Sequence, residues 1–144
     1  MKLDEKLINN IKGFLDVHEG KALYDIALEA SRYGPCLEIG SYCGKSTVYI
    51  GSACKKNSGI LFSIDHHQGS EEQQPGEEYF DPELFDHETS RVDTFKAFRK
   101  TIEAAGLVDT VVPMVCNSEV AARQWTTPLC LVFIDGGHSY EAVY

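Results

Sequence analysis

The sequence predicts an α/β fold with a doubly wound, mostly parallel sheet and helices on both faces. Two patterns lead to this prediction. Short, strongly apolar segments typical of strands alternate with longer segments whose apolar residues recur at helical spacing. The spacing between them is that of βαβ units, which build parallel sheets. The chain has 144 residues, 43% of them hydrophobic and 24% charged, so we expect one globular domain over residues 1–144.

Residues 1–33 are expected to form helices that precede the sheet. Apolar side chains recur at helical spacing over residues 3–16, and Gly13 and Gly20 are expected to break this region into short helices. Residues 21–32 show a second helical pattern that ends at a Tyr-Gly-Pro run.

Residues 36–144 are expected to hold the sheet and the functional site. Strands are predicted at 36–40, 60–65, 110–116 and 129–137, and helices at 45–56, 91–106, 118–125 and from 138 onward. Ser118 is a plausible cap for its helix. Pro113 lacks the N–H that a sheet ladder needs, so we expect the third strand to lie at an edge or to carry a bulge.

Residues 66–90 interrupt the alternation as an acidic loop excursion. This segment contains eight Asp and Glu residues and no Lys or Arg, and it is too long for an ordinary connection. Two interpretations stay open: a lid over a substrate pocket, or a solvated, disordered loop.

Composition argues against several kinds of partner. The formal net charge is −9, with 13 Lys and Arg against 22 Asp and Glu, which disfavours nucleic acid. No run approaches the roughly 20 apolar residues of a membrane span, and the N-terminus does not resemble a signal peptide. We therefore expect a cytoplasmic protein. The five cysteines form no Cys-x-x-Cys pair, which favours free, mostly buried thiols.

The C-terminal segment is expected to begin a helix that does not end within the sequence. Its last residues, "GGHSYEAVY", look like the first turns of a helix without a stop residue. The apolar fourth strand would also be left at an edge, which is prone to aggregation. We expect either further chain with C-terminal strands or another subunit, as in a homo-oligomer, to cover that edge.

The segment "CLEIGSYCGKST", residues 36–47, narrows the type of ligand. A phosphate-binding loop needs four residues between its glycines, whereas Gly40 and Gly44 are separated by three. The dinucleotide fingerprint needs a glycine two residues after Gly40, where Tyr42 stands. Both a nucleoside triphosphate and NAD are therefore disfavoured.

The remaining pattern, E-x-G-x-x-x-G, suits an amino acid group. Gly40 permits a sharp turn and a close ligand, and Gly44 brings a helix N-terminus near, which suits a carboxylate. Glu38 suits an ammonium group. Asp65 ends the next strand, where an acid can accept both hydroxyls of a ribose. An amino acid joined to a nucleoside describes S-adenosylmethionine.

Four segments carry a family resemblance: "LEIGSYCGKST", "SIDHH", "CNSEVAA" and "VFIDGGHSYEAV". Together they resemble the class I S-adenosylmethionine-dependent methyltransferases, and within them the small-molecule O-methyltransferase-like group with a "DGGHSY"-type motif. The likeness covers residues 21–144. It implies a Rossmann-like sheet, S-adenosylmethionine as cofactor and a small-molecule methyl acceptor.

The resemblance also implies which residues contact the cofactor. The methionine end of the cofactor would pass the backbone of Gly40, Ser41 and Gly44, with Glu38 near its amino group. Asp65 would hold the ribose hydroxyls, and Ser118 would hydrogen-bond the adenine. The sequence departs from the family pattern at Cys116, where a glycine is usual, and near Asn117.

Catalytic roles follow from the same resemblance. Asp135 would face the reacting methyl group, and in catechol-type members this aspartate binds a divalent metal such as Mg²⁺. Those members carry a lysine base three residues later, where this sequence has His138. A histidine can take a proton from a hydroxyl near pH 7. Tyr42 and Trp125 either stack on the cofactor or serve packing.

The residues alone leave other roles open. Glu38 could be a helix-capping or surface acid, and His138 could cap a helix or contact the ligand without catalysis. His66 and His67 could bind a metal together with His138, or could be polar loop residues.

We therefore predict a methyltransferase that uses S-adenosylmethionine and acts on an oxygen of a small molecule. One alternative is an S-adenosylmethionine-binding protein without transfer activity. A less favoured one is a nucleotide- or NAD-binding oxidoreductase on the same sheet.

Overall fold

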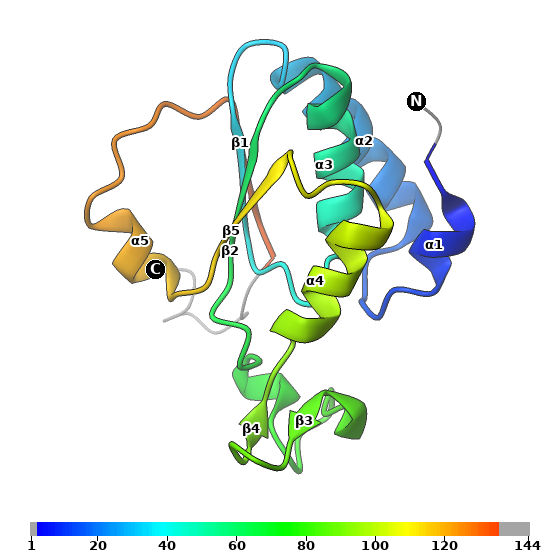
Figure 1. Cartoon of the computed structure of the whole chain (residues 1–144), viewed down its shortest axis with the longest axis vertical. Helices are drawn as coiled ribbons and strands as arrows, with labels where there is room; N and C mark the ends of the chain where they lie inside the picture. The colour runs from blue at the N-terminus through cyan, green and yellow to red at the C-terminus, as the bar shows by residue number, and fades with distance from the viewer. Residues whose placement is uncertain (1–2, 136–144) are drawn as a thin grey trace.

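The computed structural model describes residues 3–135 and contains a four-stranded parallel sheet in the order β5-β2-β1-β6 (Figure 1). Helices α2, α3 and α4 lie on one face of the sheet and α5 lies on the other. This arrangement confirms the predicted doubly wound α/β fold. The strands are β1 (Cys36–Ile39), β2 (Leu61–Ile64), β5 (Val111–Met114) and β6 (Leu131–Ile134).

The N-terminal helices differ from the prediction. Helix α1 spans Glu5–Asn9, and α2 spans Val17–Ala30, with the Asp16 carboxylate accepting an N–H of its first turn. The expected break at Gly20 is wrong, because this glycine lies inside α2. A Cβ at Gly20 would come within 2.3 Å of the Tyr49 ring, so the glycine serves close packing of α2 against α3.

The helices predicted at 45–56, 91–106 and 118–125 are all present, and two of them are shorter than expected. Helix α3 spans Lys45–Lys56, as predicted. Helix α4 spans Phe95–Ala104 and starts later than expected, because the Asp93 carboxylate accepts the Phe95 N–H there. Helix α5 spans Ser118–Ala122, one residue after the cap position, which Asn117 occupies.

Strand β5 lies at an edge of the sheet in the described part of the chain. It pairs only with β2, and Pro113 stands opposite Ser63 in that pairing. The prediction made from Pro113 is therefore confirmed.

The acidic excursion, residues 66–90, is folded, which contradicts its interpretation as a disordered loop. It contains two 3₁₀ turns, η1 (Glu71–Gln73) and η2 (Pro82–Leu84), and strand β3 (Phe85–Asp86), which pairs with β4 (Arg91–Val92) in an antiparallel hairpin. Figure 1 shows this hairpin at the lower end of the molecule. Its apolar residues form a cluster with the N-terminal segment and α3: Ile8, Ile11, Cys43, Val48, Tyr49, Leu84 and Val92.

The main core lies between the sheet and helices α2, α3 and α4. Its buried members include Leu23, Cys36, Ile50, Leu61, Phe98, Leu107 and Val111. The opposite face of the sheet is more open, since Val132 and Ile134 of β6 are 48% and 61% exposed. The five cysteines are free, and three of them are buried. Among the described residues, no helix is long and apolar enough to cross a membrane.

Candidate functional site

The strand order indicates the carboxyl ends of β1 and β6 as the place where a ligand would bind. Along the chain, the strands added after β1 extend the sheet on one side as β2 and β5, and β6 then joins the other side. In such sheets ligands bind at the carboxyl ends of the strands, at this reversal of direction. The Asp135 N–H donates to the Ile39 carbonyl at 2.8 Å, so the end of β6 lies directly beside Gly40.

The loop of residues 40–44, which we call the glycine loop, needs its two glycines. Gly40 and Gly44 have backbone φ angles of 90° and 96°, a region that residues other than glycine rarely adopt. A Cβ at Gly44 would also come within 2.9 Å of the Thr101 side chain. Gly44 immediately precedes α3, so the helix begins without a side-chain cap, with its first N–H groups at the loop.

Ser41 presents an unused hydroxyl inside this loop. The residue is only 2% exposed, yet its Oγ has no hydrogen-bond partner among the described residues. A buried hydroxyl without a partner is destabilising, so such groups are rare unless they serve a ligand or an ordered water. The Ser41 hydroxyl therefore has hydrogen-bonding capacity that the described residues do not use.

Glu38 is fully buried, so the interpretation of it as a surface acid is wrong. The hydroxyls of Thr47 and Ser63 both donate to Oε1, the latter at 2.8 Å, and the Ser46 hydroxyl donates to Oε2 at 3.1 Å. Burial raises the pKa of Glu38 to about 7, although the three hydroxyls oppose this shift. The side chain joins β1 and β2 to the first turn of α3, and no described Lys, Arg or His forms an ion pair with it.

Asp65 connects the end of β2 to the glycine loop. Its Oδ2 accepts the Tyr42 N–H at 2.8 Å and its Oδ1 accepts the His67 N–H at 2.8 Å. Asp65 is also close enough to Glu38 to raise the pKa of that carboxyl slightly. The structure therefore brings Glu38, Ser41 and Asp65 to one end of the sheet.

A cavity of about 420 Å³ lies beyond Asp65, at the ends of β2 and β5. Its lining consists of His66, Gln68, Val115, Cys116, Asn117 and Val120. Ser118 adjoins this lining as the exposed first residue of α5. A larger cavity, of about 720 Å³, lies between α1, the excursion and α4, and none of the sequence-predicted site residues lines it.

His67 is a buried packing residue rather than a polar loop residue. Its Nδ1 lies 2.7 Å from the Thr94 hydroxyl, and its ring contacts Phe95 and Phe98. Burial is the main reason that the pKa of His67 is lowered. Within residues 3–135, no three His, Cys, Asp or Glu side chains are grouped as a metal site would require, and His138 lies outside that range.

One further sequence interpretation, that of Trp125, is resolved by side-chain contacts. The Trp125 ring packs edge-on against Phe62 at 5.1 Å, and its N–H donates to the Thr127 carbonyl. Trp125 is thus anchored by the sheet face in this structure. The hydroxyl residues around Glu38 were not predicted. Ser63, a single polar residue in an otherwise apolar strand, was the available indication.

Comparison with known proteins agrees with this fold. The family model described as a methyltransferase domain matches residues 37–144. Among solved structures, an O-methyltransferase from Bacillus cereus in complex with S-adenosylhomocysteine is 18% identical, with a TM-score of 0.60, over 92% of this chain and 55% of that chain.

Two further solved structures show the same likeness. TomG, an O-methyltransferase from Streptomyces achromogenes involved in tomaymycin synthesis and solved with S-adenosylmethionine, is 18% identical, with a TM-score of 0.62, over 94% of this chain and 55% of that chain. The S-adenosylhomocysteine-bound methyltransferase PaMTH1 from Podospora anserina is 15% identical, with a TM-score of 0.51, over 91% and 54%.

These structural likenesses establish the fold, and this chain spans about half the length of the solved structures. The family match extends over most of the sequence and includes both the glycine loop and Asp135. The chain belongs to the family of methyltransferase domains that this family model describes.

Proposed function

We propose that this protein is an S-adenosylmethionine-dependent methyltransferase that transfers a methyl group to an oxygen of a small molecule. The observation that carries the proposal is the buried hydroxyl of Ser41, which has no partner within residues 3–135 and lies in a loop with two left-handed glycines. This loop lies where the strand order reverses, next to the carboxylate of Asp65.

The residues present fit the two polar ends of the cofactor. The backbone of Gly40 and Gly44 and the Ser41 hydroxyl would hold the methionine carboxylate, which also favours the N-terminus of α3. The ammonium group would be stabilised by the negative charge of Glu38. Asp65 would accept the ribose hydroxyls, exchanging part of its present backbone hydrogen bonding for them.

The 420 Å³ cavity supports an adenine position. It begins next to Asp65 and is lined by apolar Val115 and Val120 together with the polar Asn117. A flat heterocycle needs this combination of apolar walls and a few polar groups. Ser118, at the start of α5, would supply a further hydrogen bond.

Bound S-adenosylmethionine supplies a methyl group that its positively charged sulfur has already activated. The task of this chain is then to align the acceptor oxygen and to remove its proton. We propose that His138 is the base that removes this proton. His138 follows Asp135, at the end of β6, by three residues in the sequence. Asp135 would border the reacting atoms. A Mg²⁺ ion at Asp135 stays a prediction.

The alternative function is binding of S-adenosylmethionine without methyl transfer. It is considered because the chain spans about half the length of the similar solved structures. His138→Ala separates the two functions. We expect this variant of the full-length protein to release S-adenosylhomocysteine at least tenfold more slowly, because the acceptor proton loses its base.

Turnover would be scored with a panel of phenols and aliphatic alcohols, and S-adenosylmethionine affinity would be measured by calorimetry on the same samples. Affinity should be nearly unchanged in His138→Ala. Unaltered turnover in this variant would remove His138 from the mechanism, and wild-type binding without any turnover on the panel would favour the non-catalytic alternative.

A further inference from the structure

The larger cavity, of about 720 Å³, is enclosed by parts of the chain that are distant in the sequence. Its walls come from the N-terminal segment, the excursion and α4, and the glycine loop contributes Cys43. No described residue that we assign to the cofactor or to methyl transfer lines it. Its volume falls within the range of about 300–1,000 Å³ that is typical of small-molecule pockets. The cavity is therefore large enough for a ligand of its own.

The buried part of the cavity lining offers no charged group. It consists of Ile11, Cys43, Leu84 and Thr101. The Thr101 hydroxyl donates to the carbonyls of Cys43, at 2.7 Å, and Ala97, at 3.0 Å, so its proton is already in use. Burial raises the pKa of Cys43 to about 12, which keeps its thiol uncharged. The inner end of the cavity therefore suits an apolar group.

Most charged groups at the rim of the cavity already have partners. The Lys12 ammonium is shared by Asp81 and Glu83, at 2.6 Å and 2.5 Å. Asp86 and Asp93 each accept the backbone N–H of the residue two positions further along the chain, at 2.8 Å and 2.9 Å. These groups are therefore less available to a ligand than a side chain without a partner.

Two lysines of α4 on the same rim differ in this respect. Lys96 and Lys100 both line the cavity, and neither forms an ion pair with another residue of the range 3–135. They are four residues apart in α4, so they lie on one face of the helix. Two neighbouring ammonium groups can stabilise one negative charge together. The acids of the excursion disfavour a second negative charge on the same ligand.

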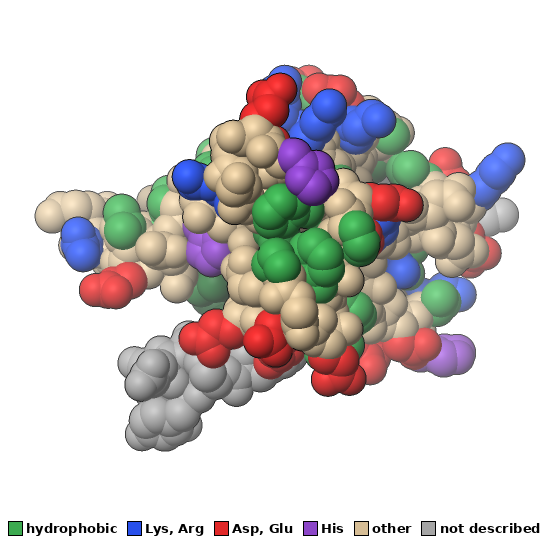
Figure 2. Space-filling view, turned by 90° about the horizontal axis from the view of Figure 1, so that it is seen from below, with side chains coloured by type: hydrophobic (Ala, Val, Ile, Leu, Met, Phe, Trp, Pro, Cys, Tyr) green, Lys and Arg blue, Asp and Glu red, His purple; other side chains and the backbone are tan. Residues whose placement is uncertain are grey.

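Figure 2 views the molecule from the end that carries the excursion. Several Lys and Arg side chains lie together along the upper edge of this view, and Asp and Glu side chains lie along its lower edge. The two signs of charge are thus separated at this end of the molecule. The formal net charge of −9 therefore does not exclude a local site for an anion.

We propose that the 720 Å³ cavity is a second ligand site, separate from the cofactor site, and that it binds an aliphatic monocarboxylate. The apolar chain of the ligand lies against the buried lining, which removes apolar surface from water. The carboxylate lies at the rim between the ammonium groups of Lys96 and Lys100. Binding at this site does not depend on the proposed methyltransferase activity.

The test measures the binding of four probes to the full-length protein by saturation-transfer NMR titration. Octanoate, octan-1-ol and octylammonium share an alkyl chain and differ in charge, and acetate keeps the carboxylate without the chain. We expect octanoate to bind most tightly and acetate most weakly. The double variant Lys96→Met/Lys100→Met should weaken octanoate binding about three- to twentyfold, as for two lost exposed ion pairs. Binding of octan-1-ol should be nearly unchanged in this variant.

Lys21→Met/Lys56→Met is the matched control, because it also removes two exposed ammonium groups and neither residue lines the cavity. Octanoate should bind this control like the wild type. Equal octanoate affinity in the two double variants would overturn the proposal, since binding would then not involve Lys96 and Lys100. Octylammonium or acetate binding as tightly as octanoate would overturn it too. So would displacement of octanoate by S-adenosylhomocysteine, because octanoate would then occupy the cofactor site.

Discussion

Ser41 and Glu38 are buried polar residues three positions apart that differ in how well their hydrogen-bonding groups are satisfied. Among the described residues, Glu38 has three hydroxyl donors and no cationic partner, whereas the Ser41 hydroxyl has no hydrogen-bond partner at all. Bound S-adenosylmethionine would resolve both, by bringing an ammonium group toward the carboxylate and a carboxylate toward the hydroxyl. Each residue therefore yields a prediction in which stability and binding respond differently.

Ser41→Ala should leave the free protein as stable as the wild type or more stable by up to about 1 kcal/mol, since it removes an unsatisfied buried hydroxyl. The same variant should bind S-adenosylmethionine about five- to tenfold more weakly, as expected for one lost hydrogen bond. Urea unfolding and calorimetry measure the two quantities. Ser46→Ala is the matched control and should cost stability, because Ser46 donates to Glu38. A large loss of stability in Ser41→Ala would mean that the hydroxyl has a structural partner.

Glu38 should make stability depend on pH. Its pKa is about 7 in the folded protein, above its ordinary value of 4.5, so the folded state holds this proton more tightly than the unfolded state. The contribution of Glu38 to stability is therefore complete below pH 4.5 and is lost as the pH rises through 7. Between pH 6 and pH 8 the loss should be about 1 kcal/mol.

Urea unfolding of the wild type and of Glu38→Gln at pH 6 and pH 8 measures this loss. The amide of Glu38→Gln does not titrate, so the wild type should lose more stability than the variant between the two pH values. An identical change in both proteins would show that Glu38 is already ionised at pH 6.

Residue-level prediction from the sequence succeeded where a motif carried the information. The spacing of Gly40 and Gly44 excluded a phosphate loop, and the structure gives both glycines left-handed φ angles. The hydrogen bonds from Ser46, Thr47 and Ser63 to Glu38 were missed, because they depend on how α3 packs on the sheet. No local pattern in the sequence reports such a contact.

At the scale of elements, the sheet and its helices were easier to predict than the excursion. Helix α3 and strand β2 show clear periodicity, and their positions were predicted to within a residue or two. The sequence of the excursion shows no periodicity of apolar residues. Its short turns and the two-residue strands of its hairpin are stabilised instead by contacts with the N-terminal segment. Its fold is a tertiary effect, and its role as a lid stays a prediction.

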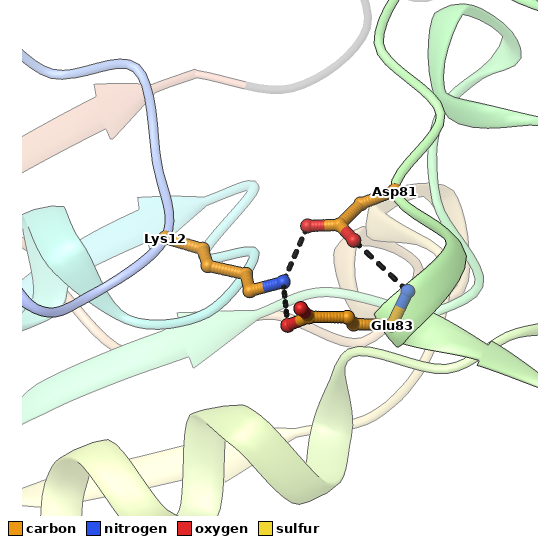
Figure 3. A network of polar contacts seen from close by, with 3 residues as sticks. All are labelled: Lys12, Asp81 and Glu83. Atoms are coloured by element: carbon orange, nitrogen blue, oxygen red, sulfur yellow. Dashed lines mark hydrogen bonds and ion pairs between the residues drawn. The ribbon is translucent and has the colours of Figure 1, made fainter.

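Lys12 is the polar connection between the N-terminal segment and the excursion (Figure 3). Its ammonium lies 2.6 Å from Asp81 and 2.5 Å from Glu83, and these hydrogen bonds raise the pKa of Lys12 and lower the pKa of Asp81. The group is partly exposed, so Lys12→Met should change the free energy of unfolding by no more than about 1 kcal/mol. The excursion should nevertheless exchange amide hydrogens faster, because local opening needs less energy than global unfolding.

Hydrogen exchange with mass spectrometry measures this effect, and the difference from wild type should shrink at high salt. Lys21→Met is the control, because the Lys21–Glu5 pair is longer, at 3.6 Å, and does not involve the excursion. Equal exchange in the excursion of wild type and Lys12→Met would show that apolar contacts alone hold the two segments together.

At the scale of the whole molecule, the order of strands and helices indicated the doubly wound sheet, and the position of Pro113 indicated its edge strand. The identity of the methyl acceptor did not follow, because no motif in the sequence reports which chemical group an acceptor pocket would recognise. The exposed Val132 and Ile134 of β6 leave an apolar face and edge in the described part of the chain. The solved relatives are about twice as long as this chain.

Titration calorimetry of S-adenosylmethionine into the full-length wild type and Asp65→Ala tests the central claim most directly. We predict saturable one-to-one binding by the wild type, no comparable binding of NAD or ATP, and a loss of roughly 1–3 kcal/mol in Asp65→Ala from the missing ribose hydrogen bonds. Asp109→Ala, which removes an exposed acid far from the glycine loop, should bind like the wild type. Binding of NAD or ATP in preference to S-adenosylmethionine, or equal S-adenosylmethionine affinity in Asp65→Ala and wild type, would contradict the account.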